Sequence, residues 1–254
     1  MIDIHAHILP GIDDGAADMN NALEMASLAV ESGVTVMVAT PHSSVYGEPQ
    51  NFWDQNLARK VRDFRDALEK ENIPLKVAPG MEIFGTPEVA ELLRTRKMIG
   101  LNGSDYPLIE FSFSNYAAEA TEILEEVLSL GMRPVVAHPE RYKYVQRDPS
   151  LLNLWVEMGC LLQVNKGSLL GNFGKNEKYL ALELVERNFA FAVASDAHSP
   201  EIRTTWMKDV RQLLKEEFSE QTAEKLLCSI PFSMLISGYS ASGENVMGAS
   251  CSRA

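Results

Sequence analysis

The chain has 254 residues, 46% of them hydrophobic, which is enough for one large α/β domain with a buried core. Its 23 basic and 35 acidic residues give a formal net charge of −12, which disfavours nucleic acid and anionic membranes as partners because both require a basic surface. The sequence has no apolar stretch near the roughly 20 residues of a spanning helix and no secretory signal pattern, so we expect neither membrane insertion nor secretion.

Apolar, β-branched runs recur along the chain and predict seven strands. These runs are Met1–His5, Val34–Thr40, Leu75–Met81, Pro107–Phe113, Pro134–His138, Leu161–Asn165 and Phe189–Ser195. Segments with helical periodicity separate them. The clearest helix face is formed by Trp53, Leu57, Val61, Phe64 and Leu68.

Two further helices are expected at Ala117–Leu130 and Pro149–Met158, each followed by a glycine suited to a left-handed cap, Gly131 and Gly159. Strand–helix alternation predicts an α/β fold with a parallel sheet, and seven strands favour a closed or nearly closed barrel. An open, doubly wound sheet is the alternative. We expect one domain over residues 1–232 and a Ser/Gly-rich, poorly ordered tail over 233–254.

Every histidine lies where a strand-like run ends, and two carboxylates occupy equivalent places. The histidines are His5, His7, His42, His138 and His198, and the carboxylates are Glu82 and Glu110. Imidazole nitrogens and carboxylate oxygens are ligands that divalent transition metals prefer. Because a (β/α) barrel assembles its active site at the carboxyl ends of its strands, this pattern predicts a multinuclear metal enzyme.

His5 and His7 are two residues apart on an extended chain, so both side chains project the same way and can chelate one metal. Asp13-Asp14-Gly15 offers another oxygen ligand, and Asp196 with His198 repeats the two-residue spacing at the last strand end. Ordinary loop histidines, a turn at Asp13-Asp14 and a helix cap at Asp196 are the alternatives. They weaken when all the motifs are considered together.

Glu82 and Glu110 lie at or within apolar runs, where an unpaired charge is too costly, so each needs a salt bridge or a metal. Their places at strand ends favour metal. Arg141, three residues after His138, carries a planar fork that binds phosphate at two points. The alternative for Arg141 is a salt bridge with Glu140 or another acid on the rim.

These motifs, IDIHAHILPGIDDG, ATPH, PGMEI, LIEF, AHPER and VASDAH, resemble those of the polymerase and histidinol phosphatase (PHP) superfamily. More narrowly, they resemble its metal-dependent bacterial protein-tyrosine phosphatases of capsule and exopolysaccharide synthesis. The resemblance runs in order from Met1 to about His198. It implies a distorted, TIM-like (β/α)7 barrel with three metal ions at the carboxyl ends of the strands.

Carried over by motif, the resemblance implies three metal sites, with Glu82 bridging two of them and Arg141 binding the substrate phosphate. The first site would use His5, His7, Glu82 and Asp196, the second Asp14, His42 and His198, and the third Glu82, Glu110 and His138. Aspartate at position 14 and glutamate at position 110 match the tyrosine phosphatase branch better than the histidinol phosphatase branch. The oxygen-rich set favours manganese, with iron, zinc or magnesium as alternatives.

The implied activity is hydrolysis of phosphotyrosine by a metal-activated hydroxide, on a bacterial tyrosine kinase that regulates polysaccharide export. Other PHP-type phosphoesterases, acting on histidinol phosphate or nucleotides, are the nearest alternative. An amidohydrolase-type enzyme and a non-enzymatic metal-binding regulator are more distant. Tyr46 and Phe52 could line a phosphotyrosine pocket, although an ordinary surface loop is preferred. A homo-oligomer is left open.

A cysteine-dependent tyrosine phosphatase is excluded. That chemistry needs Cys followed by five residues and Arg, whereas Cys160 is followed at that spacing by Lys166, and Cys228 and Cys251 fit no better. Three cysteines, an odd number without metal-type spacing, suit a reducing compartment, so we expect a cytoplasmic protein.

Overall fold

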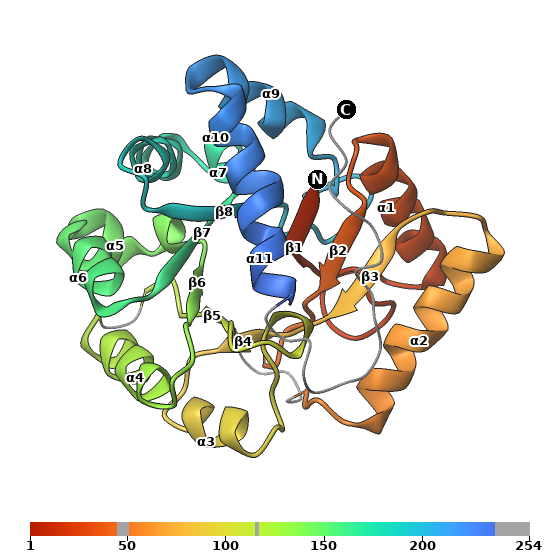
Figure 1. The fold of residues 1–254 in the computed structure, drawn as a ribbon, viewed down its shortest axis with the longest axis horizontal. Helices are drawn as coiled ribbons and strands as arrows, with labels where there is room; N and C mark the ends of the chain where they lie inside the picture. The colour runs from red at the N-terminus through yellow and green to blue at the C-terminus, as the bar shows by residue number, and fades with distance from the viewer. Residues whose placement is uncertain (45–50, 115–116, 237–254) are drawn as a thin grey trace.

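The computed structural model describes residues 1–44, 51–114 and 117–236, in which parallel strands are surrounded by helices (Figure 1). The strands are β1 (Ile2–Ala6), β2 (Val36–Ala39), β3 (Lys76–Pro79), β4 (Glu82–Phe84), β5 (Leu108–Glu110), β6 (Val135–Ala137), β7 (Leu161–Asn165) and β8 (Ala190–Ala194).

The strands form two parallel sheets, β1-β2-β3 and β4-β5-β6-β7-β8, each in chain order. Isolated parallel bridges connect the sheets at both edges, Ala6 with Ala197 and His42 with Glu82. The strands therefore follow one another around a common interior (Figure 1). The expected α/β class with parallel strands is confirmed, although single bridges rather than continuous ladders join the two sheets.

The strand count differs from the expected seven because the run Leu75–Met81 does not continue as one strand. β3 ends at Pro79, and β4 begins at Glu82 in the other sheet. Between them, a Cβ on Gly80 would lie 2.7 Å from a methyl group of Val38, so only glycine lets the chain pass this close to β2. The step from one sheet to the other produces the eighth strand.

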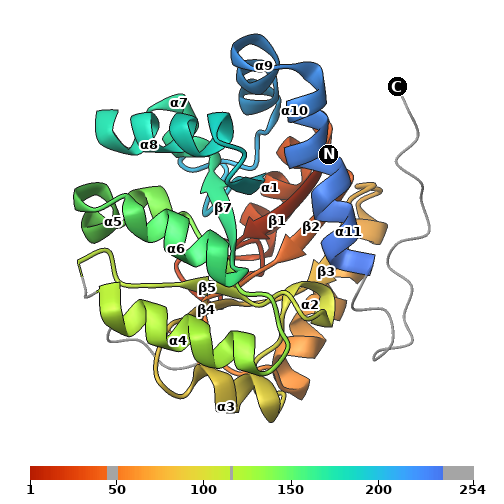
Figure 2. The ribbon, with the colours of Figure 1, turned by 60° about the vertical axis from the view of Figure 1, so that its left-hand side comes forward.

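Helices follow most strands and cover their outer side (Figures 1 and 2). The α-helices are α1 (Met19–Glu31), α2 (Gln55–Lys70), α3 (Val89–Arg94), α4 (Ala117–Ser129), α5 (Lys143–Arg147), α6 (Ser150–Met158), α7 (Lys166–Leu170), α8 (Lys175–Glu186), α9 (Lys208–Glu217), α10 (Glu220–Glu224) and α11 (Ile230–Ile236). Three short turns complete the set: η1 (Leu101–Gly103), η2 (Pro139–Arg141) and the π-helical η3 (Lys225–Ser229). None of the helices in the described ranges is long and apolar enough to cross a lipid bilayer.

The helices expected from periodicity are present. In α2, four of the five residues expected on one face are buried, namely Leu57, Val61, Phe64 and Leu68. The side chain of Asp54 caps this helix by accepting hydrogen bonds from the backbone N–H groups of two residues in the first turn. Gly159 caps α6 with a φ of 105°, as expected for a left-handed C-terminal cap.

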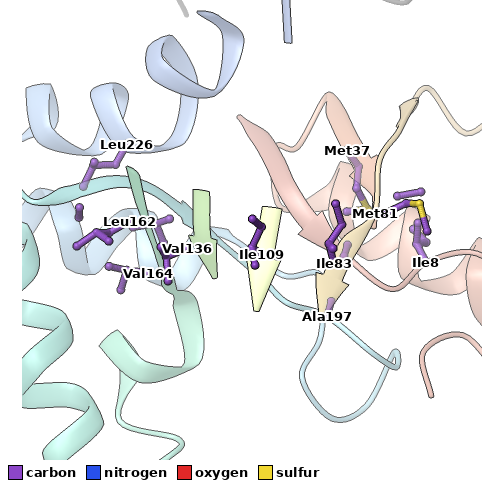
Figure 3. Close-up of a cluster of buried hydrophobic side chains, with 14 of the residues drawn as sticks. Ile8, Met37, Met81, Ile83, Ile109, Val136, Leu162, Val164, Ala197 and Leu226 are labelled. Atoms are coloured by element: carbon purple, nitrogen blue, oxygen red, sulfur yellow. The ribbon is translucent and has the colours of Figure 1, made fainter. Parts of the chain in front are cut away.

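Successive strand residues face two different hydrophobic clusters because side chains alternate across a strand. In β5 and β6, Ile109 and Val136 belong to the outer cluster, which lies between strands and helices and is shown in part in Figure 3. Their neighbours face an interior cluster. The interior cluster consists of Ile2, Ile4, Val36, Val38, Ala78, Leu101, Leu108, Val135, Ala137, Leu161, Ala192, Ala194, Met234 and Leu235.

Helix α11 packs against the interior cluster through Met234 and Leu235, and Asn102 donates a hydrogen bond to the carbonyl of Leu235. Residues 233–236, which the sequence assigned to the tail, therefore belong to the fold. Their packing against strand residues was not visible in a segment rich in Ser and Gly. The rest of the expected tail, residues 237–254, lies outside the described residues.

Candidate metal centre

The structure brings all nine expected metal ligands together at the carboxyl ends of the strands. A pocket of about 650 Å³ lies above them and is lined by Arg141 and by seven of the nine: Asp14, His42, Glu82, Glu110, His138, Asp196 and His198. The other two, His5 and His7, are fully buried and contact Glu82. Complete burial within this cluster is unusual for ordinary loop histidines and favours the expected role, which stays a prediction.

Backbone irregularities place several of these side chains. The register of β1 against β2 shifts between Asp3 and Ala6, in the segment that contains His5. His138 directly follows β6 and has a φ angle of 35°. Asp196 lies two residues after β8 and has a φ angle of 49°. Residues other than glycine rarely adopt this backbone conformation, and such backbone strain concentrates at functional sites.

The first group of potential ligands combines two imidazoles and two carboxylates. Nε2 of His5 and Nε2 of His7 lie 3.2 Å apart, each is 3.1 Å from Oε2 of Glu82, and each is 3.5 Å from Oδ1 of Asp196. All four atoms are close enough to one another to share one cation. This is the set expected for the first metal.

The second group is more exposed. Oδ1 of Asp14 lies 3.5 Å from Nε2 of His42 and 3.4 Å from Nε2 of His198, and His7 also comes within reach. The three residues expected for the second metal are thus together. Asp14 is half-exposed at the pocket edge, whereas both histidines are mostly buried.

The third group differs in one respect from the expected set. Nδ1 of His42 lies 3.1 Å from Oε2 of Glu82 and 2.9 Å from Oε1 of Glu110, so His42 presents one nitrogen to each of the second and third groups. Nε2 of His138 lies 3.0 Å from Oε1 of Glu82 and 4.0 Å from Oε2 of Glu110. His138 is adjacent to the third group, as expected, but His42 joins that group more closely.

The hydrogen bonds around the first group fit a bound cation. Nδ1 of His5 donates to Oε1 of Gln163 over 2.9 Å, and Nδ1 of His7 donates to Oδ2 of Asp13 over 2.8 Å. When these rings are neutral, as metal binding requires, the lone pair of each Nε2 points inward. Oε2 of Glu82 is buried among three imidazole nitrogens at 3.1 Å but accepts no hydrogen bond of acceptable geometry. A cation at this point would satisfy all of these atoms.

Without a cation, protons take its place. Burial alone lowers the pKa of His5, but the carboxylates of Glu82 and Asp196 outweigh burial and raise it above the usual value. Burial alone raises the pKa of Glu82, yet the imidazoles of His5 and His42 hold it well below the usual range. The pKa of Glu110 is raised by burial and by the charge of Glu82. Burial lowers the pKa of His138 to about 4, so this imidazole stays neutral and able to bind metal.

Asp196 also explains the environment of Arg141. Nη1 of Arg141 lies 3.1 Å from Oδ2 of Asp196, rather than pairing with Glu140, whose Oε1 accepts a hydrogen bond from the backbone N–H of Asn165. The guanidinium carbon lies 4.7 Å from the ring centroid of Phe113 and 4.4 Å from that of Phe173, so both rings make cation–π contacts with it. Arg141 thus lines the pocket, and the salt bridge that was the alternative role for this residue is formed with the ligand Asp196 rather than with Glu140.

Three neighbours of the ligands were not found from the sequence. Gln163 orients His5, and Nδ2 of Asn165 donates a 2.6 Å hydrogen bond to Oδ2 of Asp196. Arg203 also contacts this oxygen, at 2.5 Å, and lines the pocket. The polar Gln163 inside the apolar strand LLQVN was a usable signal. Arg203, in an irregular loop, carried none.

Of the two aromatic residues considered for a phosphotyrosine pocket, the structure describes only Phe52. Tyr46 lies outside the described residues. Phe52 is not among the residues that line the pocket, and its ring lies 5.9 Å from Nζ of Lys97. Aromatic side chains in the pocket come instead from the ends of β4 and β5, as Phe84, Phe111 and Phe113.

Parallel strands that end in a mostly buried cluster of five histidines and four carboxylates define a metal-dependent hydrolase of the α/β class. The chain belongs to the capsular polysaccharide synthesis CpsB/CapC family, whose sequence model matches residues 1–236.

Individual relatives agree with this family. The chain is 41% identical over 227 residues to the tyrosine-protein phosphatase YwqE of Bacillus subtilis (strain 168), covering 87% of this chain and 86% of the relative. It is 33% identical over 210 residues to the putative tyrosine-protein phosphatase CapC of Staphylococcus aureus, covering 83% and 82%.

A solved structure is also similar. It belongs to a study of YwqE from Bacillus subtilis and CpsB from Streptococcus pneumoniae, described as unique metal-dependent tyrosine phosphatases. The TM-score is 0.82 at 37% identity, and the match covers 94% of this chain and 93% of the other.

Proposed function

We propose that this chain is a metal-dependent protein-tyrosine phosphatase that hydrolyses phosphotyrosine monoesters in proteins. The observation that carries the proposal is the convergence of three groups of metal-ligating atoms directly beside Arg141 in one pocket. Relatives named as tyrosine-protein phosphatases, over most of the length of both chains, support it.

The nine ligands hold three divalent ions in this proposal, with manganese as the favoured metal because the set is rich in oxygen. His5, His7, Glu82 and Asp196 hold the first ion. Asp14, His42 and His198 hold the second, and Glu82, Glu110 and His138 hold the third, with His42 close enough to contribute its other nitrogen. Glu82 is the shared carboxylate because its two oxygens face different imidazoles.

Metal ions, when bound, lower the pKa of water to near neutrality and neutralise charge on a phosphoryl group. Arg141 and Arg203 supply the remaining positive charge of the pocket from its rim, and their planar forks bind phosphoryl oxygens. Oδ2 of Asp196 holds both guanidinium groups in place before substrate arrives. The donors are therefore preorganised for the charge that develops in the transition state.

The physiological substrate proposed here is a bacterial tyrosine kinase that controls capsule or exopolysaccharide synthesis, since the family is one of capsular polysaccharide synthesis. The acidic chain is suited to a protein partner rather than to nucleic acid. A cytoplasmic location rests on cysteine usage and stays a prediction, as does the oligomeric state.

Phosphate release tests the proposal. Phosphotyrosine peptides, histidinol phosphate and a nucleoside monophosphate should be assayed with metal-free protein reloaded with Mn²⁺, Fe²⁺, Zn²⁺ or Mg²⁺. Fast release from the peptides alone is expected, with Mn²⁺ most effective. A preference for histidinol phosphate or the nucleotide would assign a different phosphoesterase, and no hydrolysis of p-nitrophenyl phosphate would favour amidohydrolase chemistry.

Metal removal provides the second part of this test. Exhaustive chelation should abolish hydrolysis, and added Mn²⁺ should restore it. Elemental analysis of the reloaded protein counts the ions, for which three per chain are expected. Full activity after complete metal removal would contradict the proposal.

A further inference from the structure

One wall of the metal pocket is aromatic, although the floor is polar. Phe84 ends β4, and Phe111 and Phe113 follow β5, so three phenylalanines line the pocket on the side of these two strands. Phe111 is only 5% exposed, but Phe113 is 40% exposed. An apolar ring left this open costs hydrophobic free energy unless a ligand covers it.

Phe113 lies directly beside the phosphate-binding end of the pocket. Its ring centroid is 4.7 Å from the guanidinium carbon of Arg141 and 5.9 Å from the ring of His138. A second ring, that of Phe173, has its centroid 4.4 Å from the same guanidinium carbon, but Phe173 is not among the residues that line the pocket. Both rings contact Arg141, but of the two only Phe113 lines the pocket and is in a position to touch a substrate.

We propose that this wall is a subsite for the aromatic ring of an aryl phosphomonoester and that Phe113 is its specificity-determining residue. The inference rests on the proposed phosphatase function and adds to it the basis of substrate choice. A phosphoryl group bound by Arg141 lies one hydrogen bond from the guanidinium. In phosphotyrosine a single oxygen joins phosphorus to the ring, so the ring reaches Phe113.

An alkyl phosphate cannot make this contact. The short side chain of phosphoserine leaves Phe113 exposed, whereas a phenyl ring packs against it and removes both apolar surfaces from water. Aromatic pairs in offset or edge-to-face geometry gain further energy beyond the area that they bury. The subsite therefore favours aryl over alkyl phosphates through binding, separately from the better leaving group that a phenolate provides.

Two inhibitors separate these effects because neither is hydrolysed. Phenylphosphonate and methylphosphonate share the phosphonate group and differ only in the ring. Their Kd values should be measured by calorimetry on the Mn²⁺-loaded wild type and on three variants, Phe113→Ala, Phe113→Tyr and Phe173→Ala. Metal content of each variant is measured in parallel, because His138 is adjacent to Phe113.

The wild type should bind phenylphosphonate more tightly than methylphosphonate, and Phe113→Ala should lose roughly tenfold of that preference with its metals retained. Phe113→Tyr, which keeps a ring, should retain the preference. Phe173→Ala should weaken both phosphonates alike, since it loosens Arg141 only.

The opposing results are equally distinct. Equal weakening of both phosphonates by Phe113→Ala and Phe173→Ala would mean that Phe113 only supports Arg141, and an unchanged preference in Phe113→Ala would also overturn the subsite. If the wild type neither binds these phosphonates nor hydrolyses any phosphomonoester, the proposed function itself is overturned.

Discussion

Nη1 of Arg141 donates a hydrogen bond to Oδ2 of Asp196 over 3.1 Å, while Oδ1 of the same carboxylate lies 3.5 Å from Nε2 of His5. One carboxylate thus faces the histidines with one oxygen and the arginine with the other. Oδ2 of Asp196 also accepts a hydrogen bond from Asn165 and forms a salt bridge with Arg203, so the orientation of this carboxylate does not depend on Arg141 alone.

Replacing Arg141 should therefore separate phosphate binding from metal binding. Arg141→Ala should keep its metal content and fold but lose about 10²–10³ in turnover, the cost of one charge-assisted contact to the transition state. Arg141→Lys should recover only part of this loss, because an ammonium lacks the two-point fork. Steady-state kinetics at saturating Mn²⁺ measure both. Arg187→Ala, which removes a surface arginine paired with Glu183, is the control, and wild-type turnover in Arg141→Ala would exclude the residue from the active site.

Replacing Glu82 should remove metal and activity together. Its two oxygens lie within 3.1 Å of imidazoles from four different histidines, so Glu82→Ala would leave neighbouring cations without their shared counter-charge. We expect at least one ion fewer per chain and a loss of turnover of more than roughly 100-fold. Elemental analysis and kinetics should be compared with Glu91→Ala, an exposed carboxylate paired with Arg94. Unchanged metal content in a folded Glu82→Ala protein would contradict the assignment.

Metal binding should release protons, and its affinity should fall in acid. The pKa values of His5, His7 and His42 lie above the usual 6.5 in the metal-free protein, because nearby carboxylates outweigh burial. These imidazoles must lose their protons to bind metal, so affinity rises with pH. Titration of metal-free protein with Mn²⁺ in weak buffer near pH 7 should acidify the solution. A pH-independent affinity between pH 6 and 8 would argue against these histidines as ligands.

The same raised pKa values make the stability of the metal-free protein depend on pH. Protonated histidines paired with carboxylates contribute stability that is fully present below pH 6.5 and is lost as the pH rises through their raised folded values. Metal-free protein should therefore have a lower Tm at pH 8 than at pH 6. Metal-loaded protein should show the opposite trend, and thermal denaturation of both forms compares them.

Alkylation of thiols should leave phosphatase activity intact. Cys160 is buried, and burial raises the pKa of its thiol to about 12, so almost none is thiolate at pH 8. Iodoacetamide should label Cys160 only after unfolding, which mass spectrometry detects. Loss of activity in step with labelling of the folded protein would point to a cysteine nucleophile.

Local sequence patterns are sufficient to predict most of the residues of the candidate metal centre. His5 lies in β1 and His7 directly follows its end, and their Nε2 atoms lie 3.2 Å apart, in agreement with side chains two residues apart that project to the same side. Glu110 was identified because a charge inside an apolar run needs a partner, and Nδ1 of His42 lies 2.9 Å from it.

Contacts between residues far apart in the sequence cannot be predicted from local patterns, because they depend on tertiary packing. The pairing of Arg141 with Asp196 joins residues 55 positions apart, and no spacing rule connects them. Arg203 lies in an irregular loop, where side-chain direction follows from packing rather than from periodicity. Similarly, the step from β3 to β4 depends on how closely Gly80 approaches Val38, a contact between strands that a continuous apolar run conceals.

The position of α11 makes the two ends of the strand interior different: one is covered by a helix, and the other carries the metal pocket. Interior residues such as Ile4 and Val38 precede the ligands along their strands, and Met234 and Leu235 close that side of the interior, so the metal pocket opens at the other. Helix α11, the last element of the described chain, lies across this side of the interior (Figure 1). Substitutions on the exposed side of α11, such as Ser233→Ala, should therefore change neither metal content nor turnover, because they lie on the far side of the interior from the ligands.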